Sequence, residues 1–309
     1  MGFMIVFQQM LVLFAMMVVG YVCYKKGMIE ERGTKTLSSI IVNVLNPILM
    51  ISSVLGDEVT YSAEIIKQNL IMVVIYFVLL IILGLLITKS FRVGRADAGS
   101  YRLMLIFSNL GFMGIPLATN LFGAKSVILL AFYMITYNVL IYTYGIYLAT
   151  QEREDTVEAG LPLKKILNPG VVGCAVAIII FAFQIRVPDF VGTFADYMGN
   201  AVIPLAMMMV GVNLAKIDLK SIFQDIRLLI MSALKLILIP IACVFIFRNL
   251  GFDATVFGIF ILVISMPVGT VILMIETEYG RDDNALCAKG ITLTTLLTLI
   301  TIPVVLAFI

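Results

Sequence analysis

The sequence predicts an all-α membrane protein of ten transmembrane helices, arranged as two inverted five-helix repeats with broken, crossing helices in the fourth and ninth positions. Composition is the first reason, because 61% of the residues are hydrophobic and 13% are charged. Ordinary globular domains have about 45–50% apolar and 25% charged residues, so no soluble core could bury this much apolar surface. The other reasons are ten apolar runs of membrane-spanning length and landmarks that recur in both halves.

The ten apolar runs give the expected helices in order. Their ranges are 4–24, 36–55, 69–88, 103–122, 126–149, 169–186, 194–214, 226–247, 254–275 and 285–308. No basic residue precedes the first run and no small-residue cleavage site follows it, so it is expected to be a retained helix rather than a signal peptide. The protein is therefore expected to be a multi-pass protein of the plasma membrane, with the lipid bilayer as its solvent.

Basic residues give the expected orientation. If the N-terminus lies outside, 16 of the 21 lysines and arginines fall on the cytoplasmic loops and span ends. Cytoplasmic loops carry an excess of Lys and Arg, so both termini are predicted to face outward.

The longest hydrophilic stretch divides the chain into two halves. We expect a first five-helix repeat over 1–149, a cytoplasmic linker over 150–168 and a second repeat over 169–309. Because each half has an odd number of spans, the second must be inverted relative to the first. The pattern N-x-x-x-P-x-x-M occurs in the second span of each half, at Asn43–Met50 and at Asn200–Met207. Recurring landmarks of this kind are typical of inverted-repeat transporters.

The fourth and ninth ranges are expected to contain broken helices. The fourth holds Gly111, Gly114 and Pro116 within six residues, and the ninth holds Pro267 and Gly269. Proline removes a backbone donor, and glycine lowers helix stability. Interrupted helices at corresponding places of two half-chains indicate a transporter's substrate site. The simpler alternative is a pair of harmless kinks, because both residues are common in membrane helices.

A helix broken inside the bilayer exposes backbone groups that lipid cannot satisfy, so it is tolerated only within protein or beside a watery cavity. If the two breaks cross, the amides just after Pro116 and Pro267 can hold an anion, as helix N-termini do. Nearby polar side chains complete the site, although Asn and Ser also bond neighbouring helices. The candidate substrate-binding residues are Asn109, Gly111, Gly114, Pro116, Ser265, Pro267, Gly269, Thr270, Asn43, Asn46 and Lys235.

Lys235 is the one ionisable residue in the middle of a predicted span. A central lysine costs about 2.5–3.5 kcal/mol on insertion scales, so it should face the protein interior. Three roles stay open: contact with an anionic substrate, a structural contact with half-helix carbonyls, or snorkelling to an interface.

Other classes of function find little support in the composition. The chain has no histidine, its net charge is +2, and its four cysteines are scattered singly. Motifs of intramembrane proteases, zinc peptidases and P-loop ATPases are absent, so we expect neither an enzyme nor a cofactor, metal or nucleic-acid partner. The acidic residues all map to loops or span ends, the nearest to the membrane being Glu64, Asp196 and Glu276. A coupling cation would therefore need neutral oxygen ligands.

The motifs resemble those of the auxin efflux carrier family, within the wider bile acid, auxin and arsenite transporter group. The resemblance rests on the N-x-x-x-P second span, on NLGFMGIP at 109–116 and on SMPVGTVILMIETEYG at 265–280. It implies a secondary transporter of small organic anions such as malate, malonate or auxin-like carboxylates. It also implies a scaffold of the first, second, sixth and seventh spans and a transport domain of the others, which moves in an elevator-like way. Substrate would bind at the crossing.

The sequence leaves three points open. A sodium-coupled symporter of the bile-acid type and a non-transporting ligand sensor are the alternative functions. The coupling ion is open between sodium and proton. The oligomeric state is open, with a homodimer as the candidate assembly.

Overall fold

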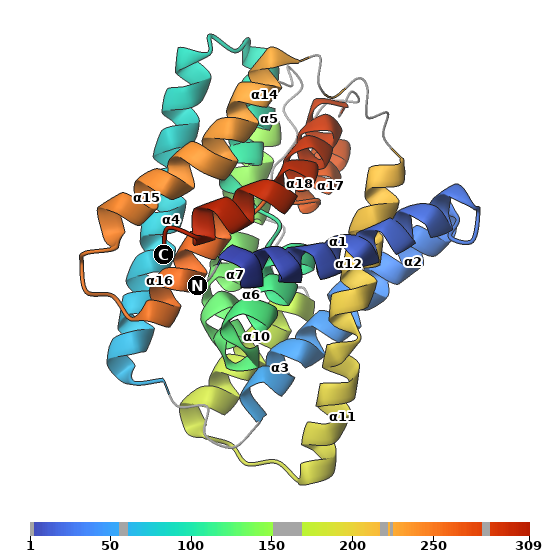
Figure 1. Cartoon of the computed structure of the whole chain (residues 1–309), viewed down its shortest axis with the longest axis vertical. Helices are drawn as coiled ribbons and strands as arrows, with labels where there is room; N and C mark the ends of the chain where they lie inside the picture. The colour runs from blue at the N-terminus through green and yellow to red at the C-terminus, as the bar shows by residue number, and fades with distance from the viewer. Residues whose placement is uncertain (1–2, 56–60, 151–168, 217–221, 223–224, 280–284) are drawn as a thin grey trace.

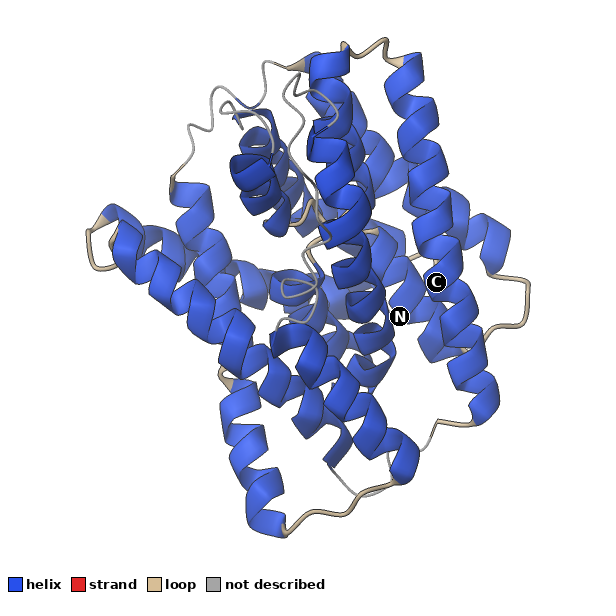
Figure 2. Ribbon diagram, turned by 180° about the vertical axis from the view of Figure 1, so that it is seen from behind, coloured by secondary structure: helices blue, strands red, loops and turns tan. Residues whose placement is uncertain are grey.

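The computed structural model describes residues 3–55, 61–150, 169–216, 222, 225–279 and 285–309. Within these ranges the regular structure is helical, and the only β-type pairing is one isolated bridge. Figures 1 and 2 show the helices from opposite sides. Apart from Thr150, the expected linker over 150–168 lies outside the described residues.

The described helices have the length and composition of a membrane protein. Six helical runs could cross a bilayer and four shorter apolar helices accompany them, so the prediction of an all-α, multi-pass membrane protein is confirmed. Ten crossings and an inverted repeat stay predictions. The six long runs are Glu31–Leu55, Ala63–Ser90, Ala124–Thr150, Asp189–Ala215, Ile226–Phe247 and Ala285–Leu306, and the four shorter helices are Met10–Lys25, Leu110–Phe122, Pro169–Phe183 and Ala254–Ile264.

The helices follow the expected ranges, with several interrupted internally. In the first half they are α1 (Phe3–Lys25), α2 (Glu31–Ile40), η1 (Ile41–Leu45), α3 (Asn46–Leu55), α4 (Ala63–Ser90), α5 (Arg95–Ile106), η2 (Leu110–Gly114), α6 (Ile115–Phe122), η3 (Ala124–Ser126), α7 (Val127–Leu140), η4 (Ile141–Gly145) and α8 (Ile146–Thr150). In the second half they are α10 (Pro169–Phe183), α11 (Asp189–Asn200), α12 (Val202–Ala215), α14 (Ile226–Ala233), η5 (Leu234–Leu238), α15 (Ile239–Phe247), α16 (Ala254–Ile264), α17 (Val271–Tyr279) and α18 (Ala285–Leu306).

Proline explains three of the interruptions. Each of Pro47, Pro116 and Pro240 is the second residue after a five-residue π-helical turn, namely η1, η2 and η5. In a regular α-helix the proline ring clashes with the carbonyl four residues earlier, and that carbonyl loses its donor. A wider π-turn moves this carbonyl away and lets the helix continue. These prolines therefore bend or widen helices without ending them.

Helices α1 and α12 pack closely where they cross, which Figure 1 shows near the right of the molecule. Gly20 of α1 faces the backbone of Met208, and Gly211 of α12 faces the backbone of Met17. A Cβ atom at either glycine would overlap that backbone. Small residues at such a seam let membrane helices approach closely.

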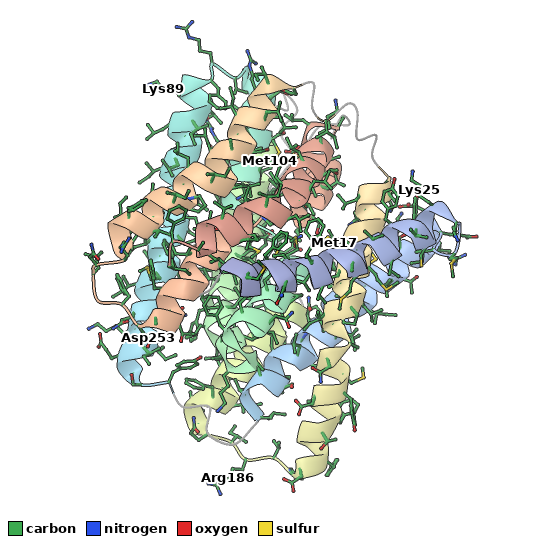
Figure 3. The ribbon with its side chains drawn as sticks, viewed as in Figure 1. Met17, Lys25, Lys89, Met104, Arg186 and Asp253 are labelled. Atoms are coloured by element: carbon green, nitrogen blue, oxygen red, sulfur yellow. The ribbon has the colours of Figure 1, made fainter. Side chains whose placement is uncertain are left out.

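Several further helix contacts complete the packing, including those of α10 with α7 and of α1 with α18. Helix α3 packs against α10 and α11, with Gly173 of α10 against Pro47 and Gly199 of α11 against Leu49. Helix α4 packs against α5, α7 and α16, while α18 contacts α5, α14 and α16. Lys89, at the end of α4, and Arg186, after α10, lie at opposite ends of the molecule in Figure 3.

Candidate functional site

Two helix breaks cross and pair through their backbones. One break lies between α5 and η2, and the other lies between α16 and α17. Ser108 and Val268 form an antiparallel bridge at the crossing. The amide of Asn109 donates to the carbonyl of Pro267, and the amide of Gly269 donates to the carbonyl of Phe107, each at 2.9 Å. The two breaks thus satisfy each other's backbone groups, which lipid could not do.

The first break lies earlier in the chain than the sequence predicts. Gly111 and Gly114 lie inside η2, and Pro116 lies in the first turn of α6, so the helix runs on through all three. The prediction that these residues break the helix is wrong, because a π-turn accommodates the proline. The interruption is instead at Phe107–Asn109, where backbone pairing with the second break holds the chain extended. Ser108 therefore opposes Val268 at the crossing, eight residues before Pro116.

Gly269 permits the close approach of the two breaks. A Cβ atom there would lie 2.9 Å from the Ser108 carbonyl oxygen and from the Tyr137 hydroxyl oxygen. At Gly114 the nearest atoms to a Cβ would be 3.6–3.7 Å away, which is ordinary contact. Of these two positions, only that of Gly269 leaves no room for a side chain.

Ser108 is the centre of a buried polar cluster. The hydroxyl of Tyr76, on α4, donates to Ser108 Oγ at 2.9 Å. Lys235 Nζ, from η5, donates to the same oxygen at 3.0 Å and to the carbonyl of Leu105 at 2.9 Å. Side chains from two separate helical runs, α4 and η5, therefore meet Ser108 at the first break.

Lys235 contacts the C-terminal end of a half-helix. Its side chain is 1% exposed, and Leu105 is in the last turn of α5, whose carbonyls lack intrahelical partners. A cation there is favoured by the helix dipole and by the free carbonyls. Within the described part of the chain, Lys235 forms no ion pair with an acidic side chain. Of the three roles left open by the sequence, this geometry favours the structural contact.

Two asparagine side chains beside the crossing each have one buried polar atom with no hydrogen-bond partner among the described residues. Asn109 Oδ1 accepts the amide of Phe112 at 3.3 Å, but its Nδ2 is buried with no hydrogen-bond partner. Asn46 is 4% exposed and its Oδ1 has no partner either. Asn46 Nδ2 lies 3.7 Å from where a Cβ of Gly111 would be, which places it against η2. Buried amide groups normally find a partner, so these two are candidate ligand contacts.

The other candidates divide between the crossing and the periphery. Pro267 and Thr270 belong to the second break, and Thr270 is partly exposed. Ser265 is fully buried, and its hydroxyl donates to the Ile261 carbonyl of its own helix. Asn43 is exposed and its Nδ2 donates to Ser39 Oγ, so it lies apart from the crossing.

The structure adds two polar residues that the sequence did not single out as interior groups. Thr294 Oγ1, on α18, accepts the amide of Val268 at 3.1 Å. Glu276 was expected at a span end, yet its side chain is 5% exposed and accepts a hydrogen bond from Ser100 Oγ at 2.8 Å. Its burial follows from the packing of α17 against α5 and α18, which the order of residues does not specify. The sequence signal that could have indicated Thr294 is the set of five threonines along α18, all of which are buried in the structure.

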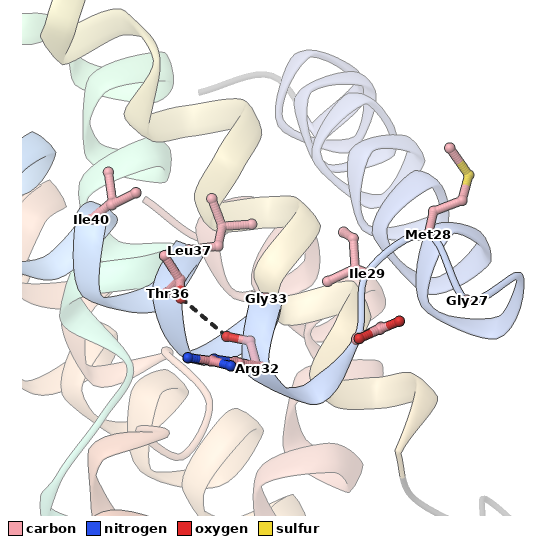
Figure 4. A pocket seen from close by; sticks show the side chains of 9 residues that line it. Gly27, Met28, Ile29, Arg32, Gly33, Thr36, Leu37 and Ile40 are labelled. Carbon is pink, nitrogen blue, oxygen red and sulfur yellow. Dashed lines mark hydrogen bonds between the residues drawn. The ribbon is translucent and has the colours of Figure 1, made fainter.

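A separate open pocket lies at the turn between α1 and α2 (Figure 4). It is lined by Gly27, Met28, Ile29, Glu30, Arg32, Gly33, Thr36, Leu37 and Ile40. None of these belongs to the crossing. Among the described residues, no group of three or more Cys, Asp or Glu side chains could hold a metal ion. The crossing is therefore the stronger candidate site.

Comparison with known proteins decides the family. A family model described as membrane transport protein matches residues 5–306. The chain belongs to this family. It is the family of the auxin efflux carriers, so the resemblance drawn from the sequence is confirmed.

Relatives of this transporter family match across most of the chain. An "Uncharacterized transporter" of Methanocaldococcus jannaschii is 24% identical and covers 97% of each chain. Another of Methanothermobacter thermautotrophicus is 23% identical and covers 93% of each chain. A Rhizobium meliloti protein named "Putative malonate transporter" is 24% identical over 86% of this chain and 84% of its own. The protein is thus a membrane transporter rather than an enzyme.

Proposed function

We propose that the protein is a secondary active carrier of small organic anions, which bind beside the crossing between Asn46 and Asn109. The observation that carries the proposal is the pair of buried, unpartnered amide groups, Asn46 Oδ1 and Asn109 Nδ2. Asn109 Nδ2 can donate to a carboxylate. Asn46 Oδ1 can accept from a hydroxyl or a protonated carboxyl, and rotation of the amide would turn a donor to the same place.

The charge distribution at the crossing supports an anion. Two half-helices begin there, η2 at Leu110 and α17 at Val271, and helix N-termini carry partial positive charge. Lys235 adds a hydrogen-bond donor at Ser108. The name of the Rhizobium meliloti relative makes malonate the first substrate to test.

The proposed mechanism is elevator-type alternating access by ten spans in two inverted repeats, with both termini outside the plasma membrane. Under this proposal α1, α2, α3, α10, α11 and α12 form the scaffold, and the helices that carry the crossing move against it. Contacts of α1 with α12, and of α3 with α10 and α11, support a scaffold of this composition. Asn46, in the scaffold, and Asn109, in the moving part, would then hold the substrate from both sides.

Transport by purified protein tests the proposal. Proteoliposomes should take up radiolabelled malonate or malate above empty vesicles, and unlabelled substrate should compete. Parallel assays with a sodium gradient, a proton gradient or neither identify the coupling ion. Absence of flux for both dicarboxylates and for indole acetate, under all three conditions, would contradict the proposed substrate class.

A further inference from the structure

The backbone amides of the second break donate hydrogen bonds toward two opposite sides of the chain. Pro267 has no amide hydrogen, the amide of Gly269 donates to Phe107, and the amide of Val268 between them donates to Thr294 Oγ1 at 3.1 Å. Successive amides of an extended chain point to opposite sides. On one side of the second break the amide hydrogen bond is accepted by the first break. On the other side it is accepted by α18.

The hydroxyl of Thr294 is oriented for this contact. It donates its own hydrogen to the Gly290 carbonyl of α18 at 2.7 Å, so its oxygen lone pairs are free to accept. Thr294 is fully buried, as is Val268. A buried amide that loses its acceptor carries the full cost of its desolvation.

Helix α18 also touches the other broken helix one turn away. At Gly290 a Cβ atom would overlap Met104 Sδ of α5, so the glycine lets α5 and α18 come into direct contact. Figure 3 labels Met104 beside α18. One turn of α18 thus contacts α5 through Gly290 and the second break through Thr294.

We propose that Thr294 is a positioning residue that fixes the second break against α18, and thereby sets where the first amides of α17 face the substrate. The amides of Thr270 and Val271 follow the three residues that are held between Phe107 and Thr294. If Val268 is released, these amides lose their fixed distance from Asn109. Thr294 itself does not touch the substrate.

Amide hydrogen exchange tests this contact without reference to any substrate. In the Thr294→Val variant, which keeps the shape of the side chain, exchange at Val268 should rise about tenfold, as expected for a lost hydrogen bond of about 1.4 kcal/mol. Thr294→Ser should restore protection. Thr292→Val is the matched control, because the Thr292 hydroxyl donates to the Ala288 carbonyl of its own helix and, among the described residues, to nothing in the second break. If the valine variant does not fold, Thr294→Cys, whose thiol is a weak acceptor, should show an intermediate rise.

The transport measurement rests on the proposed function. Thr294→Val should raise the half-saturation concentration for malonate about fivefold or more, while Thr294→Ser and Thr292→Val leave it within twofold. Exchange at Val268 that is equal in Thr294→Val (or Thr294→Cys) and wild type would overturn the inference. If wild type moves no malonate, the proposed function fails, yet the exchange result still decides the role of Thr294.

Discussion

At the scale of single residues, Gly269 is the position where the lack of room for a side chain decides the effect of a substitution. The Gly269→Ala substitution should destabilise the protein by about 1–3 kcal/mol, because the new methyl group would press on the Ser108 carbonyl and Tyr137 hydroxyl. Gly114→Ala is the matched control and should be neutral or slightly stabilising, because its surroundings leave room and alanine favours a helix. Thermal unfolding in detergent measures both. Equal unfolding temperatures for the two variants would contradict the close approach at Gly269.

Substitution of Lys235 tests whether its side chain makes a structural contact or a contact with the substrate. In Lys235→Met, the Leu105 carbonyl and Ser108 Oγ both lose the lysine donor, and Ser108 keeps the hydrogen bond from the Tyr76 hydroxyl. Exchange at the amides of Asn109 and Gly269 should therefore increase, with a smaller loss of malonate affinity than in Asn109→Ala. Unchanged exchange combined with a tenfold loss of affinity would instead assign Lys235 to the substrate.

At the scale of helices, the two prolines of the predicted breaks have different roles. Pro116 lies within a continuous helical run, whereas Pro267 lies in extended backbone between two helices. Pro116→Ala should retain malonate flux within about threefold, because the new amide can join the helix. Pro267→Ala adds a buried amide to the break and removes the block to helix continuation, so flux should be lost. A greater loss in Pro116→Ala than in Pro267→Ala would contradict this assignment.

Sequence patterns located most helices and the second break, because both depend on local composition. Apolar length predicts a membrane helix, and the Pro267–Gly269 segment has no π-turn before it. The first break could not be located this way. Phe107–Asn109 contains neither glycine nor proline, and its extended form is stabilised by hydrogen bonds to residues about 160 positions later. Burial of Glu276 and the contact of Thr294 likewise depend on tertiary packing.

At the scale of the whole molecule, the seam between α1 and α12 should limit stability. Gly211→Ala would force the two helices apart, because its methyl group would overlap the Met17 carbonyl. Gly192→Ala, on α11, meets no atom within 4 Å and serves as the control. The Gly211 variant should unfold at a distinctly lower temperature than both the control and wild type. Equal unfolding temperatures would show that the seam can separate at little cost.

The central claim is that a small organic anion binds between Asn46 and Asn109 beside the crossed breaks. The most direct measurement is malonate affinity, obtained by calorimetry on purified wild-type protein and on Asn46→Ala, Asn109→Ala and Asn43→Ala. Asn43 is the matched control, because it lies on the same helical run as Asn46 but is exposed and bonded to Ser39. The account predicts at least tenfold weaker binding for the first two variants and wild-type affinity for the third. Undiminished affinity in Asn46→Ala and Asn109→Ala would contradict it.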